Sequence, residues 1–390
     1  MRGRCRVVTQ VAMCVALGAP VAACHHDAAS SPPVVPPRRT IVFSGRNGSD
    51  PPLPVGFEDQ LFATVRDSAG AAISIPVDWR SDAPAVARID SSGVVTALAP
   101  GTLVVRATTR DGFTSATYSL PTRDATRGNV PRYAGNTAFG EPSDVDPADD
   151  VIIRRDEYTA SWNPTRGTPN WVSYDLDASH FGSEDRCDCF TYDPALPPSG
   201  RYTTADYTGA GTIAGFAIDR GHLARSFDRT GGALDNASTF YFSNIVPQAA
   251  DNNQGPWAAL EAYLSDQARL QNREVYVVAG VAGRKGTLKN AGRIVIPAQV
   301  WKVVLILRRD ATLADVTSAT DVLQVLAVLM PNDAGIRAVP WEQYRTSVDS
   351  VERVSGYDLF ALLPDSIECV VERSRTSTRT HIAAGRGSRR

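Results

Sequence analysis

The chain has 390 residues, of which 43% are hydrophobic, and its 40 Lys and Arg nearly balance its 42 Asp and Glu, for a net charge of −2. This length predicts two or three domains, and this hydrophobic content is enough to build packed cores. No run approaches the roughly 18–20 uninterrupted apolar residues of a transmembrane helix, so the sequence excludes a protein that crosses the membrane by helices.

The first 23 residues have the pattern of an export signal. Arg2, Arg4 and Arg6 form a basic stretch, and residues 11–17 form a short apolar run. The segment closes with Val-Ala-Ala-Cys, which resembles a bacterial lipobox and implies cleavage before Cys24 and acylation of that residue. The alternative is ordinary signal cleavage at the same place, without a role for the cysteine.

Residues 24–38 form an Ala-, Ser- and Pro-rich segment, which predicts an extended tether. More than one acyl chain at Cys24 would anchor the protein stably to a membrane, whereas a single chain would not. We therefore expect an exported protein that is lipid-anchored to the bacterial cell envelope, in the periplasm or at the surface. The sequence does not predict its oligomeric state.

Three cysteines remain after the predicted signal and lipid site, at positions 187, 189 and 369. An exported protein can keep disulfides, and two cysteines separated by one residue rarely pair with each other. We therefore expect Cys369 to be bonded to Cys187 or Cys189, with one thiol left over. No Cys or His pair with ligand spacing lies nearby, so we do not expect a zinc site.

Residues 39–122 alternate short β-rich runs with Asp-, Ser-, Gly- and Pro-rich turns, which predicts an antiparallel β-sandwich. The strings Val-Ala-x-Ile-Asp, Gly-Val-Val-Thr-Ala and Pro-Gly-Thr follow one another between Trp79 and Thr102. This segment resembles a bacterial Ig-like domain of group 2. The resemblance implies a module that spaces or displays other domains, and residues 123–136 are then a linker.

Histidine is the usual general base near neutral pH, and the chain has only five. His25 and His26 lie in the predicted tether, and His381 lies in the tail. His180 lies in a polar, turn-like stretch that favours a solvated loop residue. His222 is therefore the strongest candidate for a catalytic role.

His222 ends the string Asp-Arg-Gly-His, after an apolar run at residues 212–218 that predicts a strand. Gly221 lets the backbone adopt a conformation closed to other residues or approach a substrate closely. Arg220 supplies a planar, permanently charged fork that suits a phosphate. A histidine that merely ended a strand would need neither neighbour.

A second polar cluster begins about thirty residues later. Apolar residues recur with a helical period from Pro256 to Leu270, and proline suits the first turn of a helix. This places Asn253 near the N-cap and Glu261 about two turns further. Asn253 is a good cap by itself, but its amide oxygen could also bind Mg²⁺, which needs few protein ligands.

The string ending at His222, together with Asn244 and the run Asn253–Glu261, resembles the DNA/RNA non-specific endonuclease family. The resemblance covers roughly residues 137–372 and implies a ββα-metal nuclease fold of the α+β class. Its central antiparallel sheet would carry the catalytic strand and the metal-binding helix on one side. The Ig-like sandwich would precede this domain.

The resemblance implies a Mg²⁺-dependent endonuclease, with Mn²⁺ as an alternative, that hydrolyses DNA and RNA and leaves 5′-phosphates. His222 would be the general base, and Asn253 would be the direct metal ligand. Glu261 would hold a metal-bound water, and Asn244 would orient His222 or the metal shell.

Arg220 and Arg186 would bind the substrate phosphate. Family members often carry a further arginine one turn after the glutamate, where this chain has Ser265. Residues 137–372 contain 20 Lys and Arg against 32 Asp and Glu, a net charge of −12. Because phosphate neutralisation supplies most non-specific affinity for nucleic acid, we expect weak binding with positive charge confined to the cleft.

The basic segment 373–390 is expected to be a disordered, solvated tail, or alternatively an additional nucleic-acid contact. Two other functions stay open at this stage. One is a non-catalytic surface protein that binds nucleic acid, and the other is a phosphodiesterase that acts on small diesters.

Overall fold

The computed structural model describes residues 38–45, 51–128, 135–207, 216–288 and 292–374. The predicted signal peptide, Cys24, almost all of the predicted tether and almost all of the basic tail lie outside these ranges. Among the described residues, no helix is both long and apolar enough to cross a membrane.

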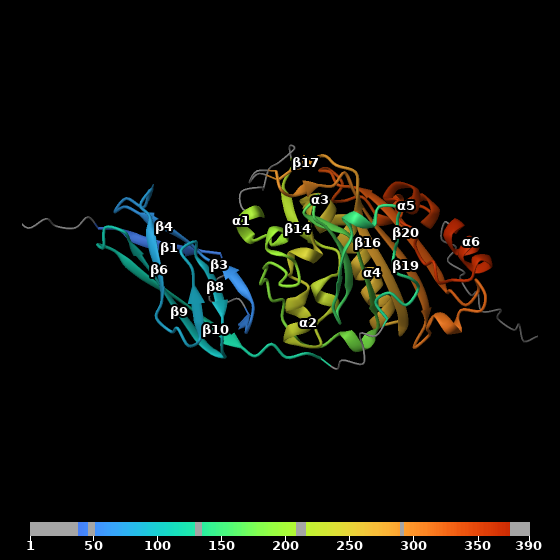
Figure 1. Ribbon diagram of the computed structural model, residues 1–390, viewed down its shortest axis with the longest axis horizontal. Coiled ribbons are helices and arrows are strands. Elements are labelled where there is room, and N and C mark those ends of the chain that lie inside the picture. Colours follow the sequence, from blue (N-terminus) through green and yellow to red (C-terminus); the bar gives the residue numbers. More distant parts are fainter. Residues whose placement is uncertain (1–37, 46–50, 129–134, 208–215, 289–291, 375–390) are drawn as a thin grey trace, which may run out of the picture. The chain divides into compact units, whose positions relative to one another are not determined.

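Residues 40–123 form the predicted all-β domain, and their strands pair in three small sheets (Figure 1). The long hairpin of β9 and β10 shows why these residues form strands. Side chains of β9 alternate between buried and partly exposed positions, so that Leu103 and Val105 point into the core. The strands are β1 Thr40–Ser44, β2 Leu53–Pro54, β3 Glu58–Gln60, β4 Phe62–Arg66, β5 Ala72–Ile73, β6 Val77–Ser81, β7 Ala87–Ile89, β8 Val94–Ala97, β9 Gly101–Thr109 and β10 Ser115–Arg123.

The second domain is built on a six-stranded sheet in the order β11-β12-β13-β16-β19-β20, and every neighbouring pair is antiparallel. Its central strands are buried along nearly their whole length, which explains their continuous Val-, Ile- and Leu-rich sequences. The strands are β11 Val151–Arg154, β12 Thr159–Asn163, β13 Thr168–Leu176, β16 Arg273–Ala282, β19 Gln299–Arg308 and β20 Gln324–Pro331.

Helices cover both faces of this sheet (Figure 1). Alternate residues of β16 point to opposite faces. Val275 and Val277 pack in one core with Leu260 and Leu264 of α4, whereas Val278 packs in another core with residues of α5 and α6. The helices are α1 Thr204–Tyr207, α2 Ala233–Ser238, α3 Ala250–Asn252, α4 Ala258–Arg269, α5 Val348–Ser355 and α6 Asp365–Arg373.

A two-stranded hairpin carries the Asp-Arg-Gly-His motif. Strand β14, Ile218–His222, contains the motif itself, and it pairs antiparallel with β15, Ile245–Ala249, with His222 opposite Ile245. The predicted strand over residues 212–218 lies mostly outside the described residues. Core residues from β15 and α4 share one cluster, so the hairpin and the helix lie on the same side of the sheet, as predicted. A further short pair is formed by β17 Gly286–Thr287 and β18 Val295–Ile296.

Asn253 does not lie at a helix N-cap, contrary to the sequence-based expectation. The chain is already helical from Ala250, and Asn253 itself has helical angles (φ −59°, ψ −45°). The helical path is instead interrupted at Gly255, where φ and ψ are both −112°. A Cβ at Gly255 would lie 2.5 Å from the carbonyl oxygen of Arg337, so this glycine permits a close backbone approach.

The disulfide prediction was wrong, because Cys187 is bonded to Cys189 and Cys369 is free. Asp188 between the two cysteines has φ +49°, a left-handed conformation that turns the chain sharply enough for the pair to meet. Cys369 lies on α6, on the opposite face of the sheet from α4.

His180 is fully buried and is not a solvated loop residue, which corrects the second histidine prediction. Its Nδ1 lies 3.3 Å from the backbone nitrogen of Asp177 and 3.3 Å from a guanidinium nitrogen of Arg229. Arg229 is also buried, and its guanidinium donates to the carbonyl oxygens of Glu157 and Asp175. The contact with buried Arg229 therefore places His180 in the interior, although its sequence neighbours are polar.

Candidate active site

One pocket of about 580 Å³ brings together most of the predicted site residues. Asn253 and Glu261 reach it from the helical segment after β15, and Arg220 and His222 reach it from β14. Arg186 reaches it from the loop that follows β13. Its lining residues are Gly182, Ser183, Glu184, Asp185, Arg186, Arg220, His222, Arg225, Ser226, Phe227, Thr230, Asn236, Asn253 and Glu261.

His222 packs against two aromatic rings that also contact each other. The ring of Phe240 lies edge-on to the imidazole at 4.8 Å, and the ring of Phe190 lies at 5.5 Å. The imidazole is buried, and its Nε2 has no hydrogen-bond partner among the described residues. Burial lowers the pKa of His222 well below its usual value, and the charges of Arg186 and Arg220 add to that effect. The imidazole is therefore neutral and able to accept a proton.

The same two rings also hold two guanidinium groups. Arg220 lies over Phe190 with its Cζ 3.8 Å from the ring centroid, and Arg186 lies over Phe240 at 4.8 Å. Arg186 also donates to Ser226 Oγ at 2.9 Å and pairs with the exposed carboxylate of Asp188 at 2.8 Å. The two cations thus line the pocket together with the imidazole, each packed on one of these rings.

Asn253 is oriented by the aspartate of the motif. Its Nδ2 donates to Asp219 Oδ2 at 2.9 Å, and Gln254 Nε2 donates to the same oxygen at 2.7 Å. Because the amide nitrogen is engaged in this way, the amide oxygen of Asn253 is left for another ligand. Asp219 therefore acts on the neighbouring side chain and does not line the pocket itself.

Glu261 is fixed by two cations on the buried side of the pocket. Lys302 Nζ lies 3.2 Å from its Oε1, and Arg225 Nε lies 3.7 Å from its Oε2. Lys302 is fully buried on β19, where burial lowers its pKa, and its ammonium lies 4.3 Å from the ring centroid of Trp257. A single lysine in the apolar run of β19 was the only sequence signal for this contact.

Asn244 is not among the residues that line the pocket. Its Nδ2 donates to the carbonyl oxygens of Ala224 and Thr239, both at 2.8 Å, and its Oδ1 accepts from the backbone nitrogen of Ala224. It is fully buried. Its side chain thus fixes the backbone just after His222, and none of these hydrogen bonds is to the imidazole or to Asn253.

Gly221 and Ser265 show why small residues stand at two places in the site. A Cβ at Gly221 would lie 2.7 Å from Cβ of Gln248 on the paired strand, so the glycine serves close packing. Ser265 donates to the buried carboxylate of Asp228 at 2.6 Å, and Arg225 Nη1 lies 3.4 Å from the same hydroxyl. Arg225 therefore occupies the space one turn after Glu261.

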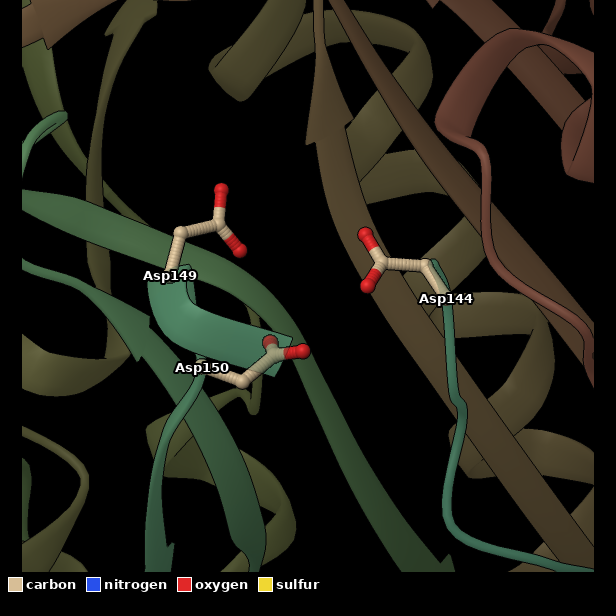
Figure 2. A group of neighbouring side chains, drawn as sticks. All are labelled: Asp144, Asp149 and Asp150. Atoms are coloured by element: carbon tan, nitrogen blue, oxygen red, sulfur yellow. The ribbon is translucent and has the colours of Figure 1, made fainter. Parts of the chain in front are cut away.

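A separate acidic cluster lies outside this pocket (Figure 2). Asp144 points from its own loop toward Asp149 and Asp150, and one carboxylate oxygen of each lies within 4.8 Å of the others. These carboxylates already accept hydrogen bonds, from Asn163 at 2.7 Å and from the hydroxyl of Tyr357 at 2.9 Å. Burial and the neighbouring charges raise the pKa of Asp149.

Comparison with known proteins identifies both domains. The family of DNA/RNA non-specific endonucleases matches residues 135–366, and the family of bacterial Ig-like domains (group 2) matches residues 54–119. A nuclease of Nostoc sp. is 36% identical over 240 residues, which are 61% of this chain and 83% of that protein. A nuclease of Serratia marcescens is 34% identical over 239 residues, 60% of this chain and 83% of that protein.

Among solved structures, the complex of EndoG with EndoGI is similar, with a TM-score of 0.49 and 22% identity over 60% of this chain and 93% of that one. The family match, the two nucleases and the antiparallel sheet with its hairpin and helix on one side agree with the sequence-based expectation of fold and activity. The chain belongs to the DNA/RNA non-specific endonuclease family and is a hydrolase that acts as an endonuclease, with a bacterial Ig-like domain of group 2 before it.

Proposed function

We propose that this endonuclease hydrolyses phosphodiester bonds in both DNA and RNA without sequence preference, with His222 as the general base and a divalent metal at Asn253. The observation that carries the proposal is the convergence of one neutral imidazole, one amide oxygen and two guanidinium groups on a single pocket. Each of these groups comes from a residue that the family resemblance singled out.

The proton transfer is assigned to His222. A neutral imidazole with an unpartnered Nε2 can accept a proton from water as the water oxygen attacks phosphorus. The bond from phosphorus to the 3′-oxygen then breaks, so the products carry a 5′-phosphate and a 3′-hydroxyl. Phe190 and Phe240 pack against the imidazole and restrict its orientation.

The family is one of divalent-metal-dependent nucleases. Asn253 fits this role, because its amide nitrogen is engaged by Asp219 and its oxygen is the kind of hard ligand that Mg²⁺ prefers. Glu261 would hold a water of the metal shell. We propose Mg²⁺ as the resident ion, with Mn²⁺ as the alternative, and either would stabilise charge on the phosphate and the leaving oxygen.

Arg220 and Arg186 are proposed to bind the phosphate at the bond that is cut. Both residues line the pocket together with His222, and guanidinium matches the geometry of phosphate oxygens. Positive charge is thus placed in the cleft of a domain whose net charge is −12 over residues 137–372.

The test is digestion of plasmid DNA and of RNA by the wild type and by His222→Ala, with EDTA and with Mg²⁺ or Mn²⁺ added back. We expect both substrates to be cut only with metal, and the variant to lose at least about 100-fold in rate. His381→Ala, in the tail, is the matched control. Unchanged digestion by His222→Ala would exclude the assigned base, and fragments that a DNA ligase cannot rejoin would exclude the 5′-phosphate.

We also propose that the protein is exported and anchored to the bacterial envelope by acylation of Cys24, and that its domains follow the boundaries given above. The support is the sequence alone: the basic and apolar stretches, the lipobox-like string and the tether composition. Labelling of cells with radioactive palmitate tests the anchor, with Cys24→Ser as the control. No label on the wild type, while a known lipoprotein is labelled, would exclude it.

A further inference from the structure

An exposed aromatic ring lies at the edge of the catalytic pocket. Phe227 lines the pocket and is 43% exposed, whereas nearly all other phenylalanines of the described residues are buried or half-buried. Phe113 of the Ig-like domain is the other exposed phenylalanine in the described ranges. Exposure of a large apolar ring is unfavourable in water, so a ring that is kept exposed at an active site suggests a ligand.

The ring is part of an ordered group of four side chains. Phe181 meets Phe227 at 5.9 Å with an interplanar angle of 62°. Arg225 lies with its Cζ 4.9 Å from the ring centroid of Phe227, and Arg269 lies 5.1 Å from that of Phe181 and 5.4 Å from that of Phe227. We call these four residues the aromatic platform.

The platform is continuous with the catalytic residues. Phe227 follows His222 by five residues, in the 3₁₀ turn Ser226–Asp228, and Arg269 is the last residue of α4, two turns after Glu261. Arg225 contacts both parts, because it lies over Phe227 and also pairs with the carboxylate of Glu261. A nucleotide chain with one phosphate at His222 would therefore reach the platform with a neighbouring nucleotide.

We propose that the aromatic platform is a nucleobase-binding subsite, in which an unpaired base of the substrate stacks against the exposed part of Phe227, next to Arg225 and Arg269. Stacking on an aromatic ring does not read sequence, because every base has a π face, so it suits a non-specific nuclease. A base inside a duplex is already stacked on its neighbours. The subsite therefore favours single-stranded DNA and RNA over duplexes. This inference rests on the proposed function.

The platform also explains how an acidic domain holds a polyanion. Affinity that comes from phosphate contacts falls steeply as salt rises, because it depends on the release of counterions. Residues 137–372 carry a net charge of −12, so we expect few cationic groups to contact the phosphates. Stacking releases no counterions, so its contribution to the binding free energy stays constant as salt rises.

Kinetics on a single-stranded oligonucleotide test the subsite. Phe227→Ala should raise KM about tenfold, within the range of about 5- to 150-fold that corresponds to the loss of one stacked base, and should leave kcat nearly unchanged. Phe227→Trp keeps an aromatic surface and should retain the wild-type KM. Phe113→Ala is the matched control for loss of an exposed phenylalanine, and thermal melts of all three variants should match the wild type.

An abasic oligonucleotide separates stacking from a purely structural effect. Removing the bases should raise KM of the wild type about as much as Phe227→Ala raises KM on the normal substrate. On the abasic substrate, the variant and the wild type should have the same KM. Equal KM values for wild type and Phe227→Ala on the normal substrate would overturn the proposal. The proposal would also be overturned if Phe227→Ala raised KM by the same factor on the normal and the abasic oligonucleotide. The effect of the ring would then not depend on a base.

Binding without cleavage distinguishes failure of the subsite from failure of the proposed function. Fluorescence anisotropy with the His222→Ala protein, in EDTA, measures affinity for a labelled oligonucleotide whether or not the wild type cuts. Adding Phe227→Ala to this protein should weaken binding about tenfold at every salt concentration, whereas adding Arg225→Ala should reduce the salt slope by about one. Unchanged binding after Phe227→Ala would refute the subsite by itself.

Discussion

Lys302 Nζ lies 3.2 Å from Glu261 Oε1, so a lysine of the central sheet fixes a carboxylate of α4. The lysine is fully buried and the glutamate nearly so. Removal of the lysine from such a pair leaves a buried carboxylate without its main counter-charge. We predict that Lys302→Met destabilises the nuclease domain by about 3–5 kcal/mol and lowers its activity.

Urea unfolding measures this effect, and Lys285→Met is the matched control. Lys285 pairs with Asp333 at the surface, where removal of an ion pair changes stability by no more than about 1 kcal/mol. If the two variants unfold at the same urea concentration, the buried pair does not have the role assigned to it.

Arg225 is predicted to bind substrate in place of the arginine that the family often carries at the position of Ser265. Its guanidinium lies against the Ser265 hydroxyl and the Glu261 carboxylate and lines the pocket. Arg225→Ala should raise KM for DNA about tenfold, since a charge-assisted contact with phosphate is lost. Arg353→Ala, an exposed arginine on α5, should have the wild-type KM. Equal KM values for the two variants would show that Arg225 does not bind the substrate.

Gly221→Ala should separate the two strands of the catalytic hairpin. The added Cβ would lie 2.7 Å from Cβ of Gln248, which is closer than two carbons can approach. We expect at least a tenfold loss of kcat, because His222 is the next residue and shifts with the strand. Adding Gln248→Gly removes that Cβ, makes room for the new carbon and should restore part of the activity. No recovery in the double variant would show that the crowding lies elsewhere.

Glu274 should make the stability of the nuclease domain depend on pH. Burial, with the nearby charge of Asp177, raises the pKa of Glu274 to about 7, against about 4.3 in an unfolded chain. The folded state therefore holds the proton more tightly, and stability falls as pH rises from about 4 to about 7. Glu274→Gln removes this titration, so its Tm should exceed the wild-type value by about 3 °C at about pH 8 and match it at about pH 4.

Calorimetry at the two pH values checks this sign. Glu342→Gln is the control, since Glu342 is exposed and its replacement should not change Tm at either pH. If the Tm of Glu274→Gln also exceeds the wild-type value at the acidic pH, the gain in stability comes from packing and not from ionisation.

The disulfide should matter for substrate binding, because the Cys187–Cys189 loop is bounded by Arg186 and Phe190. Replacing both cysteines by serine should raise KM, since Arg186 then loses a fixed position, whereas Cys369→Ser should leave KM unchanged. Alkylation of the unfolded, unreduced protein followed by mass spectrometry should label Cys369. Absence of that label, with Cys187 or Cys189 labelled, would mean that the bond is formed differently.

Much of the site could be predicted from the sequence because its chemistry is concentrated in two short segments. Asp219–His222 and Asn253–Glu261 each carry their functional residues at fixed spacing, and the hairpin and helix bring them together. Lys302 comes from a strand forty-one residues after Glu261, and only the sheet topology places it under the helix. Phe190 and Phe240, the aromatic neighbours of His222, likewise had no signal in the sequence.

The wrong predictions share one cause. His180 was expected at the surface because its neighbours are polar, yet Arg229 draws it inward from forty-nine residues away. Asn253 was assigned to a cap because Pro256 follows it, although the helical path already begins at Ala250. Cysteines separated by one residue rarely pair, yet the left-handed conformation of Asp188 allows this pair to form. In each case a local rule was overridden by a contact or a backbone angle that the local sequence does not encode.

Phe190 and Phe240 each contact both the imidazole of His222 and one of the two guanidinium groups. The imidazole and the two guanidinium groups therefore form one mechanical unit, in which none can be displaced without moving a shared ring. Substitutions within this unit should have effects that do not add, and a change of substrate geometry would require several of them at once. Single substitutions within this unit should therefore be poorly tolerated. Pocket residues outside it, such as Phe227, can be substituted one at a time.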